Sequence, residues 1–292
     1  MLPTRLKGRL LWSPANSGPL SVEKQVVTLH DLSPLDCPEH LNPRFVAWYR
    51  WLIPRLVRGV RRVIADSVFT QERLVALTDV KPEKVVVVPL GVDGRFCRRS
   101  EAEIAEVRSA LGVPTRAYLL ALGSLEPRKN LARLLSAWAE AQRRLPQEIG
   151  LVVAGGRGSR RIFQRVGLET LGARVHLTGY VREELVPALY SGALAFIFLS
   201  EYEGFGLPPL EAMACGVPVI CSNRASLPEV VGDAALLVDP TDLDAIRAAL
   251  HTLVEDTALR ETLCAKSLAR ARGFSWDHTA EQTWRVLMDS AG

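Results

Sequence analysis

Short continuous apolar runs, which are typical of strands buried on both faces, recur along the chain. Between them lie stretches whose apolar residues fall three and four positions apart, and this spacing predicts helices. Strands that alternate with helices indicate an α/β protein with parallel, doubly wound sheets. The predicted strands lie at residues 25–29, 61–67, 84–91, 118–125, 150–156, 174–181, 194–200, 217–222 and 234–240.

A boundary divides this pattern. Gly112, Val113 and Pro114 follow a charged helical block at residues 95–111. The length fits two domains of ordinary size, and the apolar fraction is ample for two cores. We therefore expect three parts, namely an N-terminal domain at 1–112, a C-terminal domain at 113–275, and a final amphipathic helix at 276–292 that packs back towards the first domain.

The stretch EGFGLPPLE joins an apolar run to a short predicted helix and places Glu203 and Glu211 around two glycines. Glycines let a backbone approach a ligand closely, and a helix N-terminus directs N–H groups and positive dipole charge at the loop. Glu211 is expected in the first helical turn, where the dipole alone favours a carboxylate. Two carboxylates beside a phosphate-binding loop favour a ligand with hydroxyls as well, such as a nucleotide sugar. The alternative is a tight turn with a dipole-paired glutamate.

The segment LGSLEPRKN, at residues 122–130, is a second candidate site. Its strand is expected to end at Gly123, and Arg128 and Lys129 open the following helix. Two cations and free N–H groups then meet at the carboxyl edge of a sheet, where they complement a diphosphate. Two unrelated exposed basic residues are the alternative.

A third candidate is the pair His30 and Asp31, which follows the strand at 25–29 and precedes a turn-rich loop. Open α/β sheets bind ligands at the carboxyl ends of their strands. In the alternative interpretation Asp31 or Ser33 caps a turn and His30 is incidental.

Residues 44–60 predict a helix, with a kink expected at Pro54. Trp48, Trp51 and the arginines of the 44–62 segment have the composition of a helix that rests on anionic lipid headgroups. An ordinary surface helix with partly buried arginine stems is the alternative.

Composition narrows the class of protein. The formal net charge of +4 fits an anionic small ligand or a membrane surface, and is too weak to indicate nucleic-acid binding. The five cysteines are scattered without a CxxC pair, and no histidines are spaced as metal ligands. No run is long enough to span a bilayer, and the first apolar stretch is too short for a signal peptide. We expect a cytoplasmic protein without a metal site, with the inner face of the membrane as an alternative location.

Three further patterns resemble known motifs, but none of them indicates a functional site. AGGRGSRR has Arg161 where a dinucleotide fingerprint has its third glycine. Asp242 and Asp244 form a DxD pattern that is typical of metal-dependent sugar transfer, but the first turn of a helix capped by Thr241 explains them better. The glutamates of EGFGLPPLE lie on one loop, whereas a hydrolase needs two carboxylates that flank a bond.

Taken in order, HDLS, ADS-FTQ, LGSLEPRKN, AGG, LTGYV, SEYEGFGLPPLEAMACGVPVI and GDAALLVDP resemble the retaining family 4 (group 1) glycosyltransferases of the GT-B fold, especially bacterial mannosyltransferase-like members. The resemblance runs from about Trp12 to the end of the chain. Its most specific element is the E-x7-E signature of Glu203 and Glu211. It implies two Rossmann-like domains that face a cleft, with the donor mostly on the C-terminal one.

The resemblance also implies roles for single residues. Arg128 and Lys129 match the cations that hold the donor diphosphate, and Glu203 matches the carboxylate that meets the hydroxyls of the donor sugar. His30 matches the N-domain histidine beside that sugar, and Glu211 matches the acid that binds the ribose. The remaining implied donor contacts are Gly123, Ser124, Tyr180, Val181, Gly204, Phe205, Gly206 and Leu207.

Two departures accompany the resemblance. Ser124 stands where many relatives have an arginine, so Arg128 is expected to supply more of the charge. Family members usually begin with a glycine-rich strand and further βα units before the HD strand, so the first part of the N-terminal domain is expected to be absent.

The implied activity is transfer of mannose or another hexose from a GDP- or UDP-linked donor to a glycan or lipid-linked acceptor in cell-surface polysaccharide assembly. No metal or other cofactor is implied. Two alternatives remain open at this point. One is a donor-binding fragment without catalysis, and the other is a nucleotide-sugar epimerase, which would need further acid and base groups.

Overall fold

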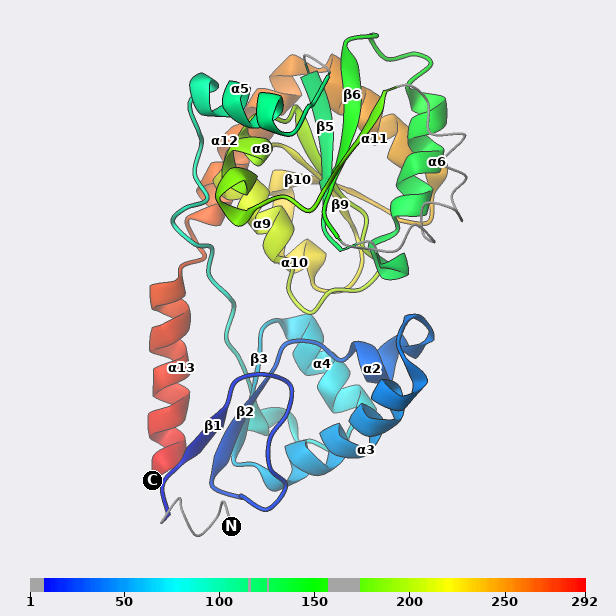
Figure 1. Ribbon diagram of the computed structural model, residues 1–292. Coiled ribbons are helices and arrows are strands. Elements are labelled where there is room, and N and C mark those ends of the chain that lie inside the picture. Colours follow the sequence, from blue (N-terminus) through cyan, green and yellow to red (C-terminus); the bar gives the residue numbers. More distant parts are fainter. Residues whose placement is uncertain (1–7, 115–116, 125, 157–173) are drawn as a thin grey trace. The chain divides into compact units, whose positions relative to one another are not determined.

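The computed structural model describes residues 8–114, 117–124, 126–156 and 174–292, so the helix expected at 159–171 lies outside the described residues, as does Arg161. The chain forms two compact units (Figure 1). The first unit comprises Met1–Gly91, Tyr202–Phe205 and Phe274–Gly292, and the second comprises Val92–Glu201 and Gly206–Gly273. The second unit thus begins upstream of the expected boundary at residue 112. We call Tyr202–Phe205 the loop tip.

Within the described residues, the first unit has a four-stranded sheet in the order β1-β2-β3-β4. All of its strand pairs are parallel, as predicted. The sequence pattern missed β1, because its few residues do not stand out as an apolar run. The strands are β1 Leu11–Ser13, β2 Gln25–Leu29, β3 Arg62–Ala65 and β4 Val85–Val87.

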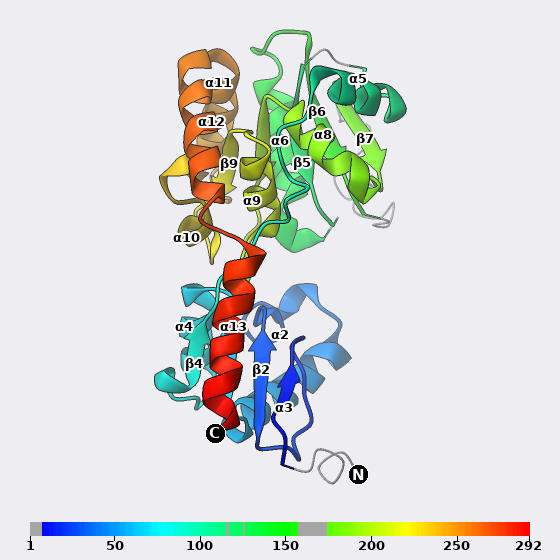
Figure 2. The same cartoon turned by 90° about the vertical axis from the view of Figure 1, so that its left-hand side faces the viewer.

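Alternate residues of β2 and β3 enter two different cores. Val27 and Val63 pack with the helices on one face of the sheet, whereas Val26 and Ile64 pack with Val286 on the other face. That second face is covered by α13 (Trp276–Ala291), which runs beside the strands in Figure 2. The helices of the first face are α2 Ser33–Asp36, α3 Pro43–Gly59 and α4 Val68–Leu77. Short 3-10 turns occupy Pro38–His40 and Pro82–Lys84.

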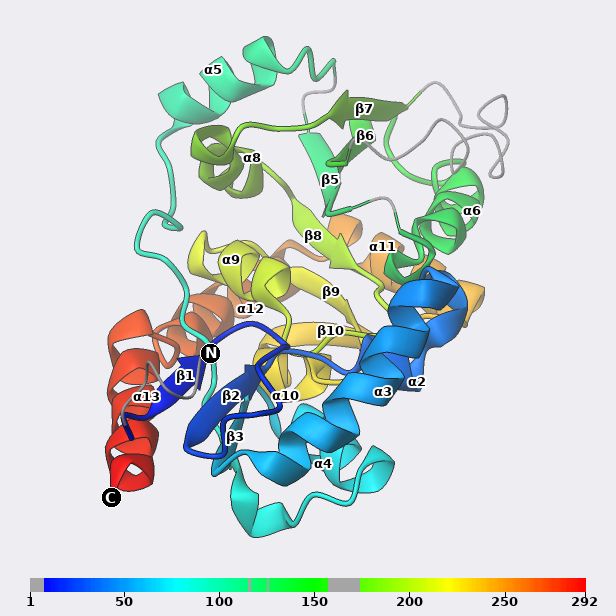
Figure 3. The same ribbon diagram turned by 60° about the horizontal axis from the view of Figure 1, so that its bottom comes forward.

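The second unit has a six-stranded sheet within the described residues, in the order β10-β9-β8-β5-β6-β7 (Figure 3). All pairs are parallel. The chain runs outward from β5 to β7, returns to β8 beside β5, and then runs outward on the other side. The strand order therefore reverses between β5 and β8, and open α/β sheets bind ligands at such a point. The strands are β5 Ala117–Leu122, β6 Ile149–Ala154, β7 Val175–Gly179, β8 Ala195–Phe198, β9 Val219–Ser222 and β10 Ala235–Val238.

Helices cover both faces of this sheet. Helices α6 and α11 pack against each other on one face, around a core that contains Trp138 and Leu250 (Figure 1). The helices are α5 Glu101–Ala110, α6 Leu131–Ala141, α8 Val186–Ser191, α9 Leu207–Ala214, α10 Leu227–Val231, α11 Leu243–Glu255 and α12 Thr257–Ala271. Short 3-10 turns are η3 Pro127–Lys129, η5 Glu183–Leu185 and η6 Gly232–Ala234.

One cap differs from expectation. The residue that caps α11 is Asp242, whose carboxylate accepts from the backbone N–H groups of Asp244 and Ala245. Thr241 instead bonds to Asp239. The Asp244 side chain pairs with Arg247. Helix capping and an ion pair therefore account for both carboxylates of the DxD pattern.

Candidate active site

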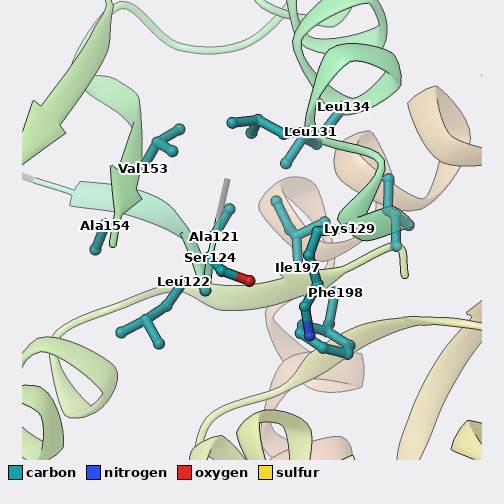
Figure 4. A pocket seen from close by; sticks show the side chains of 12 residues that line it. Ala121, Leu122, Ser124, Lys129, Leu131, Leu134, Val153, Ala154, Ile197 and Phe198 are labelled. Carbon is teal, nitrogen blue, oxygen red and sulfur yellow. The ribbon is translucent and has the colours of Figure 1, made fainter. Parts of the chain in front are cut away.

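A hollow opens at the reversal point of the second unit, at the carboxyl ends of β5, β6 and β8 (Figure 4). Gly123 and Ser124 lie on its rim, and Lys129 enters from the turn before α6. The strand ends approach closely here, because a Cβ on Gly155 would lie 2.1 Å from the carbonyl oxygen of Gly123. Three of the residues predicted to contact the donor, namely Gly123, Ser124 and Lys129, thus lie together.

Backbone contacts fix the turn η3, which carries Arg128 and Lys129. The Arg128 carbonyl accepts from the Glu201 backbone N–H at 2.8 Å and from the Ser200 hydroxyl at 3.2 Å. The Lys129 Nζ lies 4.9 Å from the centroid of the Phe198 ring, at the end of β8 (Figure 4). A cation held over an aromatic face at a strand end is preorganised to meet an anion.

Arg128 already has a carboxylate partner. Its Nε donates to Glu126 Oε2 at 2.8 Å. Burial opposes ionisation of Glu126, but hydrogen bonds from Ser124 and Arg128 outweigh it and lower the pKa of that carboxyl group. Sequence reasoning missed Glu126, although its position two residues before an arginine was a signal. Glu126 therefore acts on both predicted cations of the turn, because the charge of Lys129 also lowers its pKa.

Helix α9 begins beside β8 with Gly206 as its N-cap, at φ 123°, a conformation that only glycine adopts readily. Pro208 and Pro209 follow and have no N–H group. Of the four positions from the N-cap Gly206 to Pro209, only Gly206 and Leu207 can therefore offer an N–H to an anion. This helix N-terminus supplies fewer donors than the glycine-rich sequence predicted.

Glu211 follows the first turn of α9, so the predicted position within that turn is wrong. The helix begins at Leu207, and two prolines occupy the turn in which the carboxylate was expected. Glu211 is largely buried, and its Oε2 accepts from the Tyr190 hydroxyl at 3.2 Å. Burial raises the pKa of Glu211, while Tyr190 and the nearby Arg95 oppose that rise. Sequence reasoning did not identify Arg95, which also pairs with Glu183 at 3.0 Å.

The residues predicted beside the base follow β7. Tyr180 is 65% exposed, whereas Val181 is buried. An exposed aromatic ring next to a buried aliphatic anchor is suited to stacking on a flat ligand.

The loop tip belongs to the first unit, where it docks at the carboxyl ends of β2 and β3. The Gly204 carbonyl accepts from the hydroxyls of Ser67, at 2.6 Å, and Thr70, at 3.1 Å. A Cβ on Gly204 would lie 1.8 Å from the carbonyl oxygen of His30. Gly204 therefore has a packing reason to be glycine, in addition to the predicted approach to a ligand. Ser67 also caps α4, as predicted.

His30 is held on both ring nitrogens. Its Nδ1 lies 2.7 Å from Asp66 Oδ2, and its Nε2 lies 2.8 Å from the carbonyl oxygen of Pro14. The hydrogen bond to Asp66, opposed by burial, raises the pKa of His30. Asp31 accepts from the backbone and hydroxyl of Ser33, so it does cap a turn as the alternative interpretation held. Its neighbour His30 is nevertheless part of a built cluster.

The predicted site residues thus fall into two groups. The second unit holds the hollow, the start of α9 and Glu211, and the first unit holds His30 with Glu203, Gly204 and Phe205 of the loop tip. The signature of Glu203 and Glu211 is divided between the two units. Across the described residues, no group of three or more His, Cys, Asp or Glu side chains is arranged to hold a metal ion. No helix in the same part of the chain has the length and apolar character needed to cross a membrane.

Known families match both parts of the chain. The model described as glycosyl transferases group 1 matches residues 103–267, and that of glycosyltransferase family 4 matches residues 11–95. The O-antigen chain mannosyltransferase B of Escherichia coli is 36% identical over 267 residues, which cover 91% of this chain and 70% of that protein. The serotype-specific mannosyltransferase WbdA of Escherichia coli is 32% identical over 267 residues, and this chain spans only 32% of its length.

Solved structures agree on the fold. The Anabaena protein HepE, crystallised with UDP-glucose, superposes with a TM-score of 0.78 at 22% identity and covers 91% of this chain and 72% of its own. WaaG, a glycosyltransferase involved in lipopolysaccharide biosynthesis, gives a TM-score of 0.77 at 17% identity, with 98% of this chain and 80% of its own covered. The group 1 match spans more than half of the chain, and the match to mannosyltransferase B covers more than two thirds of both proteins. The chain therefore belongs to the group 1 glycosyltransferases and has the GT-B fold that its motifs predicted.

Proposed function

We propose that this glycosyltransferase is retaining and metal-independent. It moves mannose, or another hexose, from a GDP- or UDP-linked donor to a glycan or lipid-linked acceptor in cell-surface polysaccharide assembly. The observation that carries the proposal is the hollow at the reversal point of the second sheet, which Lys129 enters from the turn before α6. Mannose is favoured because the relative that is 36% identical is named as an O-antigen chain mannosyltransferase.

The donor diphosphate is assigned to Lys129, with Arg128 and the N–H groups of Gly206 and Leu207 around it. Negative charge grows on the diphosphate as the bond to the sugar breaks. Preorganised cations and amides stabilise that charge without a metal ion. The contacts that fix η3 support this assignment, because they hold Lys129 before a ligand arrives.

The nucleoside is assigned to Glu211 and Tyr180. A carboxylate that accepts from Tyr190 keeps further acceptor capacity, which suits the two hydroxyls of a ribose. Tyr180 offers a ring to the base. Glu203 and His30 are assigned to the hydroxyls of the transferred sugar.

We also propose that α3 contacts an anionic membrane surface. Trp48 and Trp51 are 54% and 43% exposed, and their rings lie 5.2 Å apart. Arg55 stacks over Trp51 at 5.0 Å, so a positive charge accompanies the aromatic stripe. This chemistry fits the interface between headgroups and acyl chains.

Vesicle sedimentation tests this contact. Trp48→Ala with Trp51→Ala should abolish binding to vesicles that contain anionic lipid. Trp284→Ala, which removes a similarly exposed ring from α13, should leave it unchanged. Equal binding by all three proteins, or none by the wild type, would contradict the membrane contact.

The activity itself is tested by incubating the chain with GDP-mannose, UDP-glucose or related donors, with and without a glycan acceptor and EDTA. We expect release of nucleoside diphosphate that depends on the acceptor and survives EDTA. NMR of the product should show that the anomeric configuration of the donor is retained. An isomerised nucleotide sugar would favour an epimerase, and binding without turnover would favour a donor-binding protein. Loss on chelation that manganese restores would contradict metal independence.

A further inference from the structure

The sheet of the first unit places His30 beside Asp66. Leu29 of β2 is in register with Ala65 of β3, so the next residue of each parallel strand emerges at the same edge. The two side chains meet there, with Nδ1 of His30 2.7 Å from Oδ2 of Asp66. The histidine side chain is 42% exposed, whereas the aspartate side chain is 2% exposed. Asp66 therefore acts on the surroundings chiefly through His30.

The partners of the ring determine where its protons lie. The Pro14 carbonyl can only accept, so Nε2 carries a hydrogen and donates to it at 2.8 Å. At Nδ1 the ring shares a proton with the Asp66 carboxylate. The titratable groups that act on His30 are Asp66, at the end of β3, and Asp31, the next residue in the chain after His30. The loop tip, which packs on the His30 backbone, carries Glu203. Asp66 and Asp31 both favour the protonated ring.

A contribution to folding stability does not explain Asp66. Within the described part of the chain, its second carboxylate oxygen, Oδ1, is buried without a hydrogen-bond partner. Burial raises the pKa of Asp66, because a carboxylate loses its hydration there and His30 offsets only part of the loss. Such a group costs free energy of folding, and a buried polar atom left unpaired calls for a functional explanation.

Residues 14–16, which we call the strap, hold the Pro14 carbonyl that accepts from Nε2. Asn16 Oδ1 accepts from the His30 backbone N–H at 2.6 Å, and the Asn16 N–H donates to the Thr28 carbonyl at 3.0 Å. These bonds anchor the strap to β2 and set the Pro14 carbonyl on the exposed edge of the ring. An oxygen acceptor thus occupies the position that a sugar hydroxyl would take.

We propose that Asp66 is the positioning residue of His30. Its hydrogen bond to Nδ1 orients the ring so that the Nε2 hydrogen points at a hydroxyl of the transferred sugar. That hydroxyl replaces the Pro14 carbonyl as the acceptor. The inference rests on the proposed role of His30 in sugar transfer. Asp66 itself touches no substrate. The pair resembles a histidine fixed by a carboxylate, an arrangement that selects both the tautomer and the direction of the ring.

NMR of the chain labelled at its histidines tests the pair without substrate. In the wild type, the ¹⁵N shifts of His30 should show hydrogen on both nitrogens, and its titration midpoint should fall by about one pH unit or more in Asp66→Asn. His30→Gln assigns the signal, and His176 in the second unit is the reference. Asp36→Asn is the matched control, because it removes a paired carboxylate of the same unit, bound to Arg73. A bare nitrogen in the wild type, or an unmoved midpoint in Asp66→Asn, would overturn the proposal.

Kinetics then separate a positioning role from a merely structural one. Asp66→Asn should lower kcat about 10- to 100-fold with the donor KM within about twofold, and His30→Gln combined with Asp66→Asn should be no slower than His30→Gln alone. Multiplying losses in the double variant would overturn the proposal. Because the NMR measurement needs no substrate, a failure of the pair and a failure of the proposed function are distinguished.

Discussion

The carboxyl ends of the strands carry opposite chemistry in the two units. In the second unit they present Lys129 beside a hollow, and this cation is suited to binding an anion. In the first unit they present a buried carboxylate behind a half-exposed histidine. Beside them, the Gly204 carbonyl of the loop tip accepts from the hydroxyls of Ser67 and Thr70. Parallel strands, right-handed connections and buried cores do not decide this difference. Function lies in a few side chains at the strand ends.

The division of Glu203 and Glu211 between the units extends this comparison. Glu203 stands on the loop tip that belongs to the first unit, and Glu211 is half-buried in α9 of the second. One signature therefore supplies a carboxylate to each unit. The comparison predicts that variants of the second unit change the handling of the nucleotide and the diphosphate, whereas variants of the first unit change turnover.

The largest effect is expected from Lys129→Ala. In the proposed site this cation faces the diphosphate, where charge develops, so kcat should fall about 10²- to 10³-fold, as when one preorganised donor is removed elsewhere. Lys266→Ala is the matched control, because it removes a lysine that pairs with Asp233 on the surface. Steady-state kinetics measure both. Activity of Lys129→Ala within a few-fold of the wild type would assign the diphosphate elsewhere.

Gly204→Ala tests the first unit. The new Cβ would overlap the His30 carbonyl at 1.8 Å, so the loop tip must leave its seat. We expect kcat to fall about 10- to 100-fold, because reacting groups that are displaced by about 1 Å lose rate steeply. The nucleotide affinity measured by calorimetry should stay within about twofold. Gly59→Ala, where an added Cβ meets nothing within 4 Å, should behave as the wild type. A weakened nucleotide affinity in Gly204→Ala would break the comparison.

A smaller effect is expected from pH. Burial raises the pKa of Glu211, so this carboxylate gains a proton at a higher pH than an exposed glutamate. If the ribose hydroxyls donate to the carboxylate, nucleotide affinity should weaken about tenfold as the pH falls through that raised value. The raised pKa also means that the stability contributed by Glu211 is greatest at low pH and declines as the pH rises through the folded value. Calorimetry of Glu211→Gln should show weak affinity with little pH dependence, and a wild-type profile in this variant would contradict the assignment.

The sequence predicted most of the fold because parallel, buried strands carry a strong local signal. It missed β1, whose Leu11–Ser13 segment is recognisable only by its pairing with β2. It placed Glu211 in the first turn of α9, because the start of this helix depends on the unusual φ of Gly206. Both misses concern features that tertiary pairing and backbone geometry decide, and residue spacing does not record them.

The candidate site was predicted in outline for a similar reason. Motifs indicated which loops carry chemistry, but they did not reveal that Glu126 neutralises Arg128 or that Asp66 lies against His30. Asp66 and His30 are distant in sequence and meet only through the register of two strands. The packing role of Gly204 was hidden likewise, because its neighbour is a backbone carbonyl from another loop.

The most direct test of the division between the units is to measure nucleotide affinity and turnover together for Glu203→Gln and Glu211→Gln. Each variant removes one negative charge from the same signature at similar volume. The account predicts that Glu203→Gln binds nucleoside diphosphate with an affinity within about twofold of the wild type and loses about 100-fold in kcat, whereas Glu211→Gln loses about tenfold in affinity. Loss of nucleotide affinity in Glu203→Gln, or unchanged affinity in Glu211→Gln, would contradict it.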